Sequence, residues 1–291
     1  MTVRRLGCKA AKESGGGVAE RVDIKTIYVG DKPRIAVDVA GRGPLVMFLH
    51  GNGFSRLDWH DQLRDFAPHF MAAAWDARGH AGSDDYEGPY RFADVCDDLI
   101  RVLDHLGAER AHLVGHSMGG RVVLEFQYRF PGRVKSVTFA GTSAKREPKL
   151  SDEELTIRRA RRVTPLRNGA DLRQIALDNT QRYLAKGASA KIFEAVSNRL
   201  ASVRRDSYAK TLETVVSYTD FPEYSTVTAP CLVLTGAEDP QATPDYARKV
   251  AGQIKGAKLM LIPNAGHMVN MEQSVAFSAA VLDFVRSCEG Q

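Results

Sequence analysis

The stretch at residues 115–120 reads GHSMGG and separates two segments of different character. An apolar run at residues 111–114 precedes it, and residues 121–130 predict a helix after it. The glycines around Ser117 allow a sharp backbone turn, because a Cβ there would clash with the neighbouring strand or helix. We therefore predict a nucleophile elbow that exposes the Ser117 hydroxyl beside the N–H groups of the following helix. The alternative is a glycine-rich strand-to-helix turn in which the serine is incidental.

Length and composition limit the class of protein. The chain has 291 residues, of which 44% are hydrophobic and 26% charged, as in an ordinary globular protein of one large or two small domains. The net charge is +5, but no basic block with interleaved aromatic residues occurs. This favours a mildly basic enzyme over a nucleic-acid binder.

The four cysteines lie far apart and form no C-x-x-C pair, so neither a zinc site nor a redox motif is expected. Residues 1–20 lack the apolar region of a secretory signal and are expected to be a flexible N-terminus. No apolar run reaches the 18 or so residues that would cross a membrane. We expect a cytoplasmic protein with no membrane partner.

Strand and helix patterns alternate along most of the chain, beginning with a predicted hairpin at residues 22–29 and 34–39. Residues 143–222 differ, because they predict several helices and no strand. The pattern indicates an α/β fold with a doubly wound, mainly parallel sheet. Its core is formed by residues 21–142 and 223–291, and residues 143–222 form a helical insertion. Further strands are predicted at 45–49, 71–75, 111–114, 134–139, 231–234 and 259–262, and further helices at 57–66, 92–106, 121–130, 245–254 and 275–285.

A serine nucleophile needs a base, and the base needs a carboxylate that orients it. His267 follows the last predicted strand in a loop with Pro and Gly, and Asp239 follows the strand before it. Glu238 is the adjacent competitor for the acid. Residues 140–144, where some hydrolases place the acid, contain no carboxylate. The order Ser117, Asp239, His267 is that of α/β-hydrolases.

An oxyanion hole needs two backbone N–H groups near the attacked carbonyl. Met118, directly after the serine, is expected to supply one. Asn52, after the strand at residues 45–49, is expected to supply the other, with Gly53 as an alternative. Phe54 is a candidate for the acyl side of the pocket, whereas Trp59 fits core packing equally well. No metal or cofactor is implied.

These motifs together resemble the α/β-hydrolase superfamily over about residues 22–285. The resemblance rests on HGNG at 50–53, D-x-R-G-H-x-G-S at 76–83, GHSMGG at 115–120, G-x-x-D at 236–239 and GH at 266–267. Ala81 departs from it, since many members have glycine there. The resemblance implies that Asp76 and Arg78 serve loop geometry. Haloalkane dehalogenases and epoxide hydrolases of this fold use Asp as the nucleophile, so Ser117 implies the serine branch.

The enzyme classes of this fold that use a serine nucleophile are esterases, lactonases, carbon–carbon hydrolases, perhydrolases and aminopeptidases. Residues 141–145, GTSAK, with the Arg-rich insertion, resemble 3-oxoadipate enol-lactonases. We expect a serine hydrolase of a small carboxylic ester or lactone. The alternatives are a carbon–carbon hydrolase of ring-cleavage products, a perhydrolase or cofactor-free oxygenase, and a receptor that retains the triad. The sequence does not indicate an oligomeric state.

The basic excess of the protein lies in the insertion, which the resemblance identifies as a cap over the active site. Residues 143–222 hold 16 Lys and Arg against 10 Asp and Glu, while the rest of the chain holds 24 against 25. One hypothesis is that the arginines at 158, 159, 161 and 162 include one that attracts a carboxylate-bearing substrate. The alternative is a solvated helical face.

Overall fold

The computed structural model describes residues 22–142, 151–218 and 220–290. Its centre is an eight-stranded sheet with the strand order β1-β2-β4-β3-β5-β6-β7-β8. The strands are β1 (Lys25–Val29), β2 (Ile35–Ala40), β3 (Leu45–Leu49), β4 (Met71–Trp75), β5 (Ala111–His116), β6 (Val134–Ala140), β7 (Cys231–Gly236) and β8 (Lys258–Ile262). The strand β2 pairs antiparallel with β1 and β4, while β3 to β8 pair in parallel. The predicted hairpin and the predicted mainly parallel sheet are confirmed.

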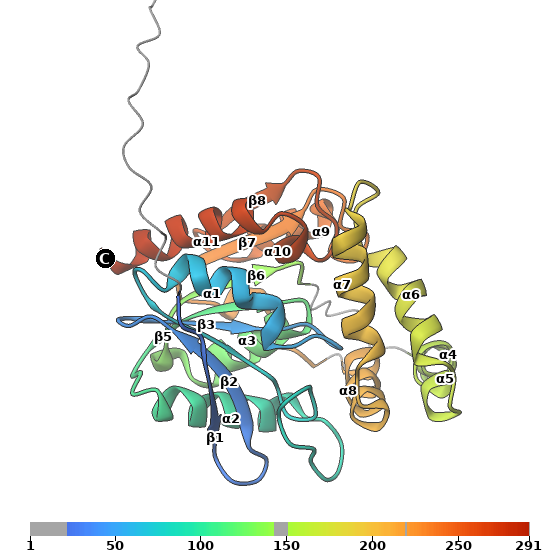
Figure 1. Cartoon of the computed structure of the whole chain (residues 1–291). Coiled ribbons are helices and arrows are strands. Elements are labelled where there is room, and N and C mark those ends of the chain that lie inside the picture. Colours follow the sequence, from blue (N-terminus) through green and yellow to red (C-terminus); the bar gives the residue numbers. More distant parts are fainter. Residues whose placement is uncertain (1–21, 143–150, 219, 291) are drawn as a thin grey trace, which may run out of the picture.

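Helices cover both faces of this sheet, as a doubly wound fold requires (Figure 1). Side chains of α2, α3 and α9 pack on one face, and those of α1 and α11 pack on the other. These core helices, with the short α10 and the 3₁₀ turns η1, η2 and η3, have the following bounds: η1 (Arg56–Trp59), α1 (His60–Phe66), α2 (Phe92–His105), α3 (Met118–Arg129), η2 (Pro131–Arg133), η3 (Tyr224–Thr226), α9 (Pro244–Gln253), α10 (Val269–Glu272) and α11 (Ser274–Glu289).

Burial explains why the central segments form these elements. All five residues of β3 are buried, as expected for a strand covered by helices on both faces. In α2 the buried residues recur at helical spacing, including Val95, Leu99 and Val102. Trp59 is 1% exposed and its ring lies 5.1 Å from that of Phe48, so it belongs to the core rather than to a pocket. Each large apolar side chain buried in this way contributes about 1.5–3 kcal/mol of transfer free energy.

The described part of the insertion, residues 151–218, consists of helices, and we call it the helical insertion. The helices are α4 (Asp152–Arg162), α5 (Thr164–Arg167), α6 (Leu172–Tyr183), α7 (Ala190–Ala201) and α8 (Arg205–Ser217). Local signals start them, since Ser151 and Glu154 form a capping box at α4 and Pro165 lies in the first turn of α5. Figure 1 shows α4 to α8 gathered at one end of the sheet.

The insertion packs through two small apolar clusters. One lies within the insertion and joins α5 and α8 through Leu166 and Leu212. The other joins the insertion to the core, because Val196 and Leu200 of α7 pack with Phe54. The helical insertion is therefore attached where the loop after β3 leaves the sheet.

Some predictions fall on residues outside the described ranges. These are the flexible N-terminus at residues 1–20 and the start of the insertion at 143–150. Among the described residues, no helix has both the length and the apolar character to cross a membrane. Cys96, Cys231 and Cys288 are free thiols, and burial raises the pKa of each of them.

Candidate active site

Ser117 occupies the turn between β5 and α3 with φ 52° and ψ −110°, a left-handed conformation that a non-glycine residue adopts only under constraint. Its N–H donates to the Ala140 carbonyl of β6 at 2.9 Å, which holds the turn against the sheet. A Cβ on Gly119 would collide with the carbonyl oxygen of Leu49, so only glycine lets α3 approach β3 this closely. The predicted strand–turn–helix junction is therefore present at this position.

His267 lies in the loop between β8 and α10. Its Nε2 is 3.1 Å from Ser117 Oγ, and its Nδ1 is 2.9 Å from Asp239 Oδ2. Asp239 and His267 are only 2% and 4% exposed, so their contact is shielded from solvent. The structure thus brings together three residues that are up to 150 positions apart in the sequence.

Asp239 follows β7 and is held in the ionised form. Its Oδ1 accepts hydrogen bonds from the backbone N–H groups of Gln241 and Ala242 at 2.7 and 2.9 Å. The Thr235 hydroxyl donates to Oδ2 at 3.1 Å. Burial raises the pKa of Asp239, but the attraction of His267 and these hydrogen bonds lower it further, so the pKa lies below its ordinary value.

An ionised Asp239 decides the tautomer of the histidine. A carboxylate only accepts hydrogen bonds, so Nδ1 of His267 carries the proton and donates it to Asp239. Nε2 is then the acceptor for the Ser117 hydroxyl. This arrangement can withdraw the hydroxyl proton when the serine oxygen attacks an electrophile. The competitor Glu238 is exposed, and Asp239 rather than Glu238 occupies the position beside His267 Nδ1.

A chamber of about 70 Å³ opens in front of the Ser117 hydroxyl and is lined in part by Asn52, Met118 and Phe54. Among the described residues, the N–H groups of Asn52 and Met118 donate to no other protein group. Both are therefore available to a negatively charged oxygen in this chamber. Phe54 is 4% exposed, and its ring lies 6.4 Å from those of Tyr183 and His116, so it forms part of the apolar wall.

The other histidines at strand ends support loops. His116 Nε2 donates to the His267 carbonyl at 2.8 Å, and burial lowers the pKa of His116 to about 3. His50 Nδ1 donates to the Gly51 carbonyl at 2.7 Å, while its Nε2 accepts from the Ala77 N–H at 2.9 Å. Burial lowers the pKa of His50 to about 4. Both rings are thus neutral and hold the chain around the site.

Asp76 and Arg78 also have structural contacts. Asp76 accepts from the backbone N–H of Arg56 at 2.7 Å and of Gly82 at 2.8 Å, and it pairs with the Arg56 guanidinium. Arg78 forms a two-point ion pair with Asp98 at 2.6 and 2.8 Å. Neither side chain lines the chamber at Ser117.

Glu272 is a residue of this site that sequence reasoning missed. Its Oε1 accepts from the N–H groups of Gly266 and Met268 at 3.1 and 3.0 Å, on either side of His267. Its Oε2 accepts from the N–H of Ala185 at 2.7 Å, at the end of α6. The carboxylate therefore joins the histidine loop to the helical insertion. Its sequence signal, a glutamate five residues after the histidine, is too common to be interpreted alone.

Arg121 is a second residue that was missed. It lies one helical turn after Ser117 and lines the same chamber. Its Nη1 donates to the Val215 carbonyl at 2.9 Å, and its guanidinium lies 5.4 Å from the centre of the Phe221 ring. Burial lowers the pKa of Arg121. A charged residue within the otherwise apolar start of α3 was the available signal.

Within residues 22–142, 151–218 and 220–290, no cluster of three or more His, Cys, Asp or Glu side chains is arranged to hold a metal ion.

A family model described as "alpha/beta hydrolase fold" matches residues 44–274. The chain is 30% identical to 3-oxoadipate enol-lactonase 2 of Acinetobacter baylyi over 82% of this chain and 87% of that protein. It is 26% identical to 2-hydroxy-6-oxononadienedioate/2-hydroxy-6-oxononatrienedioate hydrolase of Comamonas testosteroni over 87% of this chain and 91% of that protein.

A solved structure agrees at the level of the fold. The malate-bound esterase of Thermogutta terrifontis superposes with a TM-score of 0.80 at 23% identity, covering 91% of this chain and 99% of that one.

Proposed function

Because the chain belongs to the α/β hydrolase fold family, we propose that it is a serine hydrolase that cleaves a small carboxylic ester or lactone. The observation that carries the proposal is the pair of hydrogen bonds from Ser117 to His267 and from His267 to Asp239, at the floor of the chamber. A hydroxyl, a neutral imidazole and an ionised carboxylate in this order form the arrangement that acyl transfer uses.

The proposed reaction proceeds through an acyl-enzyme. Nε2 of His267 takes the Ser117 proton as Oγ attacks the carbonyl carbon, and Asp239 stabilises the resulting imidazolium. The N–H groups of Asn52 and Met118 stabilise the negative oxygen of the tetrahedral intermediate. The imidazolium then protonates the leaving alkoxide, which leaves the acyl group on Oγ. A water molecule activated by His267 attacks this ester and releases the acid.

The relatives support this choice and add information on the substrate. One is named for a lactone, and the names of both curated relatives, through "oxoadipate" and "dienedioate", denote compounds derived from dicarboxylic acids. A small substrate that carries a carboxylate is consistent with both names.

A second candidate function is carbon–carbon bond hydrolysis. The Comamonas relative is named as a hydrolase of a hydroxy-oxo-dienedioate. A compound with this name has no ester bond, so hydrolysis of this compound breaks a carbon–carbon bond. The same three side chains could carry out that reaction, because attack on a ketone carbon also gives a tetrahedral intermediate, whose negative oxygen the same two backbone N–H groups would stabilise.

The test is turnover of 4-nitrophenyl esters and small lactones by the wild type and by Ser117→Ala. We expect the substitution to lower kcat by about 10⁴-fold or more, because it removes the nucleophile. Ser225→Ala, which changes an exposed serine, is the matched control and should retain full activity. Mass spectrometry of the wild type after rapid quenching should show an acyl group on Ser117.

Turnover that survives Ser117→Ala would overturn the proposal. A folded wild type that cleaves no ester or lactone but hydrolyses a hydroxy-oxo-dienoate would favour the second candidate. Inactivity on all of these substrates, with bound ligand still detectable, would favour a receptor.

A further inference from the structure

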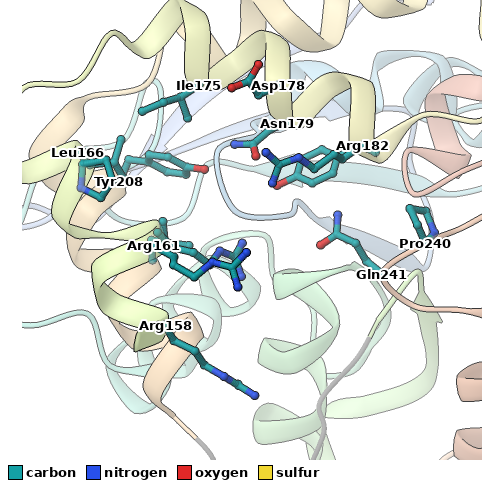
Figure 2. A pocket seen from close by; sticks show the side chains of 14 residues that line it. Arg158, Arg161, Leu166, Ile175, Asp178, Asn179, Arg182, Tyr208, Pro240 and Gln241 are labelled. Carbon is teal, nitrogen blue, oxygen red and sulfur yellow. The ribbon is translucent and has the colours of Figure 1, made fainter. Parts of the chain in front are cut away.

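A cavity of about 710 Å³ lies between the helical insertion and the loop that follows β7 (Figure 2). Three of its wall residues, Arg162, Tyr183 and Gln241, also line the small chamber at Ser117. The two spaces are therefore adjacent, with these residues between them. We call the larger space the arginine vestibule, because Arg158, Arg161, Arg162 and Arg182 line it.

The walls of the vestibule carry an excess of positive charge. Four arginines face one carboxylate, Asp178, whose Oδ1 accepts a hydrogen bond from the side chain of Gln174 at 2.9 Å. Within the described part of the chain, the guanidiniums of Arg161, Arg162 and Arg182 form no ion pair. Figure 2 shows Arg161 and Arg182 directed toward the same space from α4 and α6. Positive charge gathered in a cavity with protein walls raises the local concentration of anions.

Arg159 differs from its neighbours on α4. Its Nε lies 2.6 Å from Glu213 Oε1 on α8, a carboxylate that it shares with Arg167. Arg159 does not line the vestibule, whereas Arg182, from a different helix, does. Of the four arginines at 158, 159, 161 and 162, three therefore line the vestibule, and Arg182 of α6 joins them.

Positive charge also continues toward the serine. Arg121 and Arg162 both line the chamber, and no carboxylate side chain is among its wall residues. Asp239, directly behind it, is engaged by His267 and two backbone N–H groups. The region between the vestibule and Ser117 therefore suits a substrate that brings its own negative charge.

We propose that the arginine vestibule is a carboxylate-binding subsite and that Arg162 determines specificity for anionic substrates. This inference rests on the proposed ester or lactone hydrolysis. The substrate is a short acyl compound with its scissile carbonyl at Ser117 and a carboxylate a few carbon atoms away, at Arg162. Arg161 and Arg182 contribute to the attraction of the anion, and salt reduces this attraction because these two arginines, like Arg162, are exposed.

The experiment compares two 4-nitrophenyl esters that differ in one group. The first is the hemi-ester of glutaric acid, and the second has a carboxamide in place of the free carboxylate. Background hydrolysis is measured with Ser117→Ala and subtracted. For the wild type we expect kcat/KM to be about tenfold or more higher for the carboxylate ester, and this ratio to fall as NaCl is raised.

Arg162→Gln should reduce this ratio about tenfold, and Arg161→Gln with Arg182→Gln should weaken its salt dependence. Arg173→Gln is the matched control, because Arg173 is an exposed arginine of α6 that does not line the vestibule. Arg173→Gln should leave the ratio unchanged. Thermal melts by circular dichroism check that each variant is folded.

A ratio near one in the wild type, with both esters cleaved, would overturn the subsite and leave the proposed function standing. If neither ester is cleaved, calorimetry with glutarate and glutaramide on the wild type tests the subsite independently of the reaction. Glutarate should bind more tightly than glutaramide, and Arg162→Gln should remove the difference. Equal binding of both compounds would refute the subsite.

Discussion

At the scale of single residues, the ionisation of Asp239 determines the direction of both hydrogen bonds at the site. Two backbone N–H groups and a hydroxyl hold its carboxylate, and its pKa lies below the ordinary value despite burial. The stability that the ionised Asp239 carboxylate contributes is fully present above its pKa in the unfolded chain, near 4. It is lost as the pH falls through the lower pKa that Asp239 has in the folded protein.

Asp239→Asn should lower kcat by about 10³–10⁴-fold, because an amide can hold His267 in the tautomer that cannot accept the serine proton. Glu238→Gln is the control, since Glu238 is an adjacent and exposed carboxylate. Steady-state kinetics with a 4-nitrophenyl ester measures both. Equal losses in the two variants would show that Asp239 has no special role.

At the scale of elements, the histidine loop and the helical insertion are joined at two points. Glu272 of α10 accepts from backbone N–H groups on both sides of His267 and from that of Ala185. The His267 N–H itself donates to the Tyr183 carbonyl at 2.6 Å. Because α6 ends at Tyr183, the position of the insertion and that of the histidine are mechanically coupled.

Glu272→Gln should reduce kcat more than it changes KM, because the amide has one acceptor oxygen and places its NH₂ group against a backbone N–H. We expect a loss of about 1–3 kcal/mol in unfolding free energy, the cost of leaving a buried donor unsatisfied. Gln273→Ala, which removes an exposed contact to the Asn264 carbonyl, is the matched control. Kinetics and urea melts are the measurements. A stability loss with kcat unchanged would contradict the positioning role.

At the scale of the whole molecule, buried neutral histidines make stability depend on pH. Burial lowers the pKa of His50 to about 4 and that of both His80 and His116 to about 3. In the unfolded chain these groups bind protons near pH 6.5. Their contribution to stability is therefore fully present above pH 6.5 and is lost as pH falls toward 4 and then 3.

Urea unfolding should therefore show a free energy of unfolding that decreases from pH 7 to pH 5. The slope approaches about 1.4 kcal/mol per pH unit for each histidine below pH 6.5. The range stops at pH 5 because burial raises the pKa of Asp58 and Asp76, which opposes the effect in acid. His80→Gln should reduce the slope, because it removes one of the four buried histidines, His50, His80, His112 and His116, whose pKa is lowered. An unfolding free energy that stays level or rises over this range would contradict the prediction.

The strands and helices of the sheet and the turn at Ser117 could be predicted from local sequence patterns. Apolar runs such as residues 45–49 indicate buried strands, and regular spacing in residues 92–106 indicates a helix, because each depends only on neighbours along the chain. Parallel strands place their carboxyl ends at one edge of the sheet, so loops far apart in sequence could be expected to meet there. The strand–turn–helix junction at Ser117 could be predicted from the glycines that flank the serine, although the contact that requires Gly119 is made with the Leu49 carbonyl oxygen on β3.

The contacts between side chains of separate helices could not be predicted from local sequence patterns. Arg159 and Arg162 are both basic residues of α4, yet one pairs with Glu213 of α8 and the other lines the space before Ser117. Glu272 likewise acquires its contact with Ala185 only when the insertion rests on the histidine loop. Helix periodicity predicts which face of a helix is polar, but the partner of that face depends on how separate elements pack. The candidate catalytic residues could therefore be predicted from local sequence patterns, whereas the surroundings that we propose select the substrate arise from long-range packing.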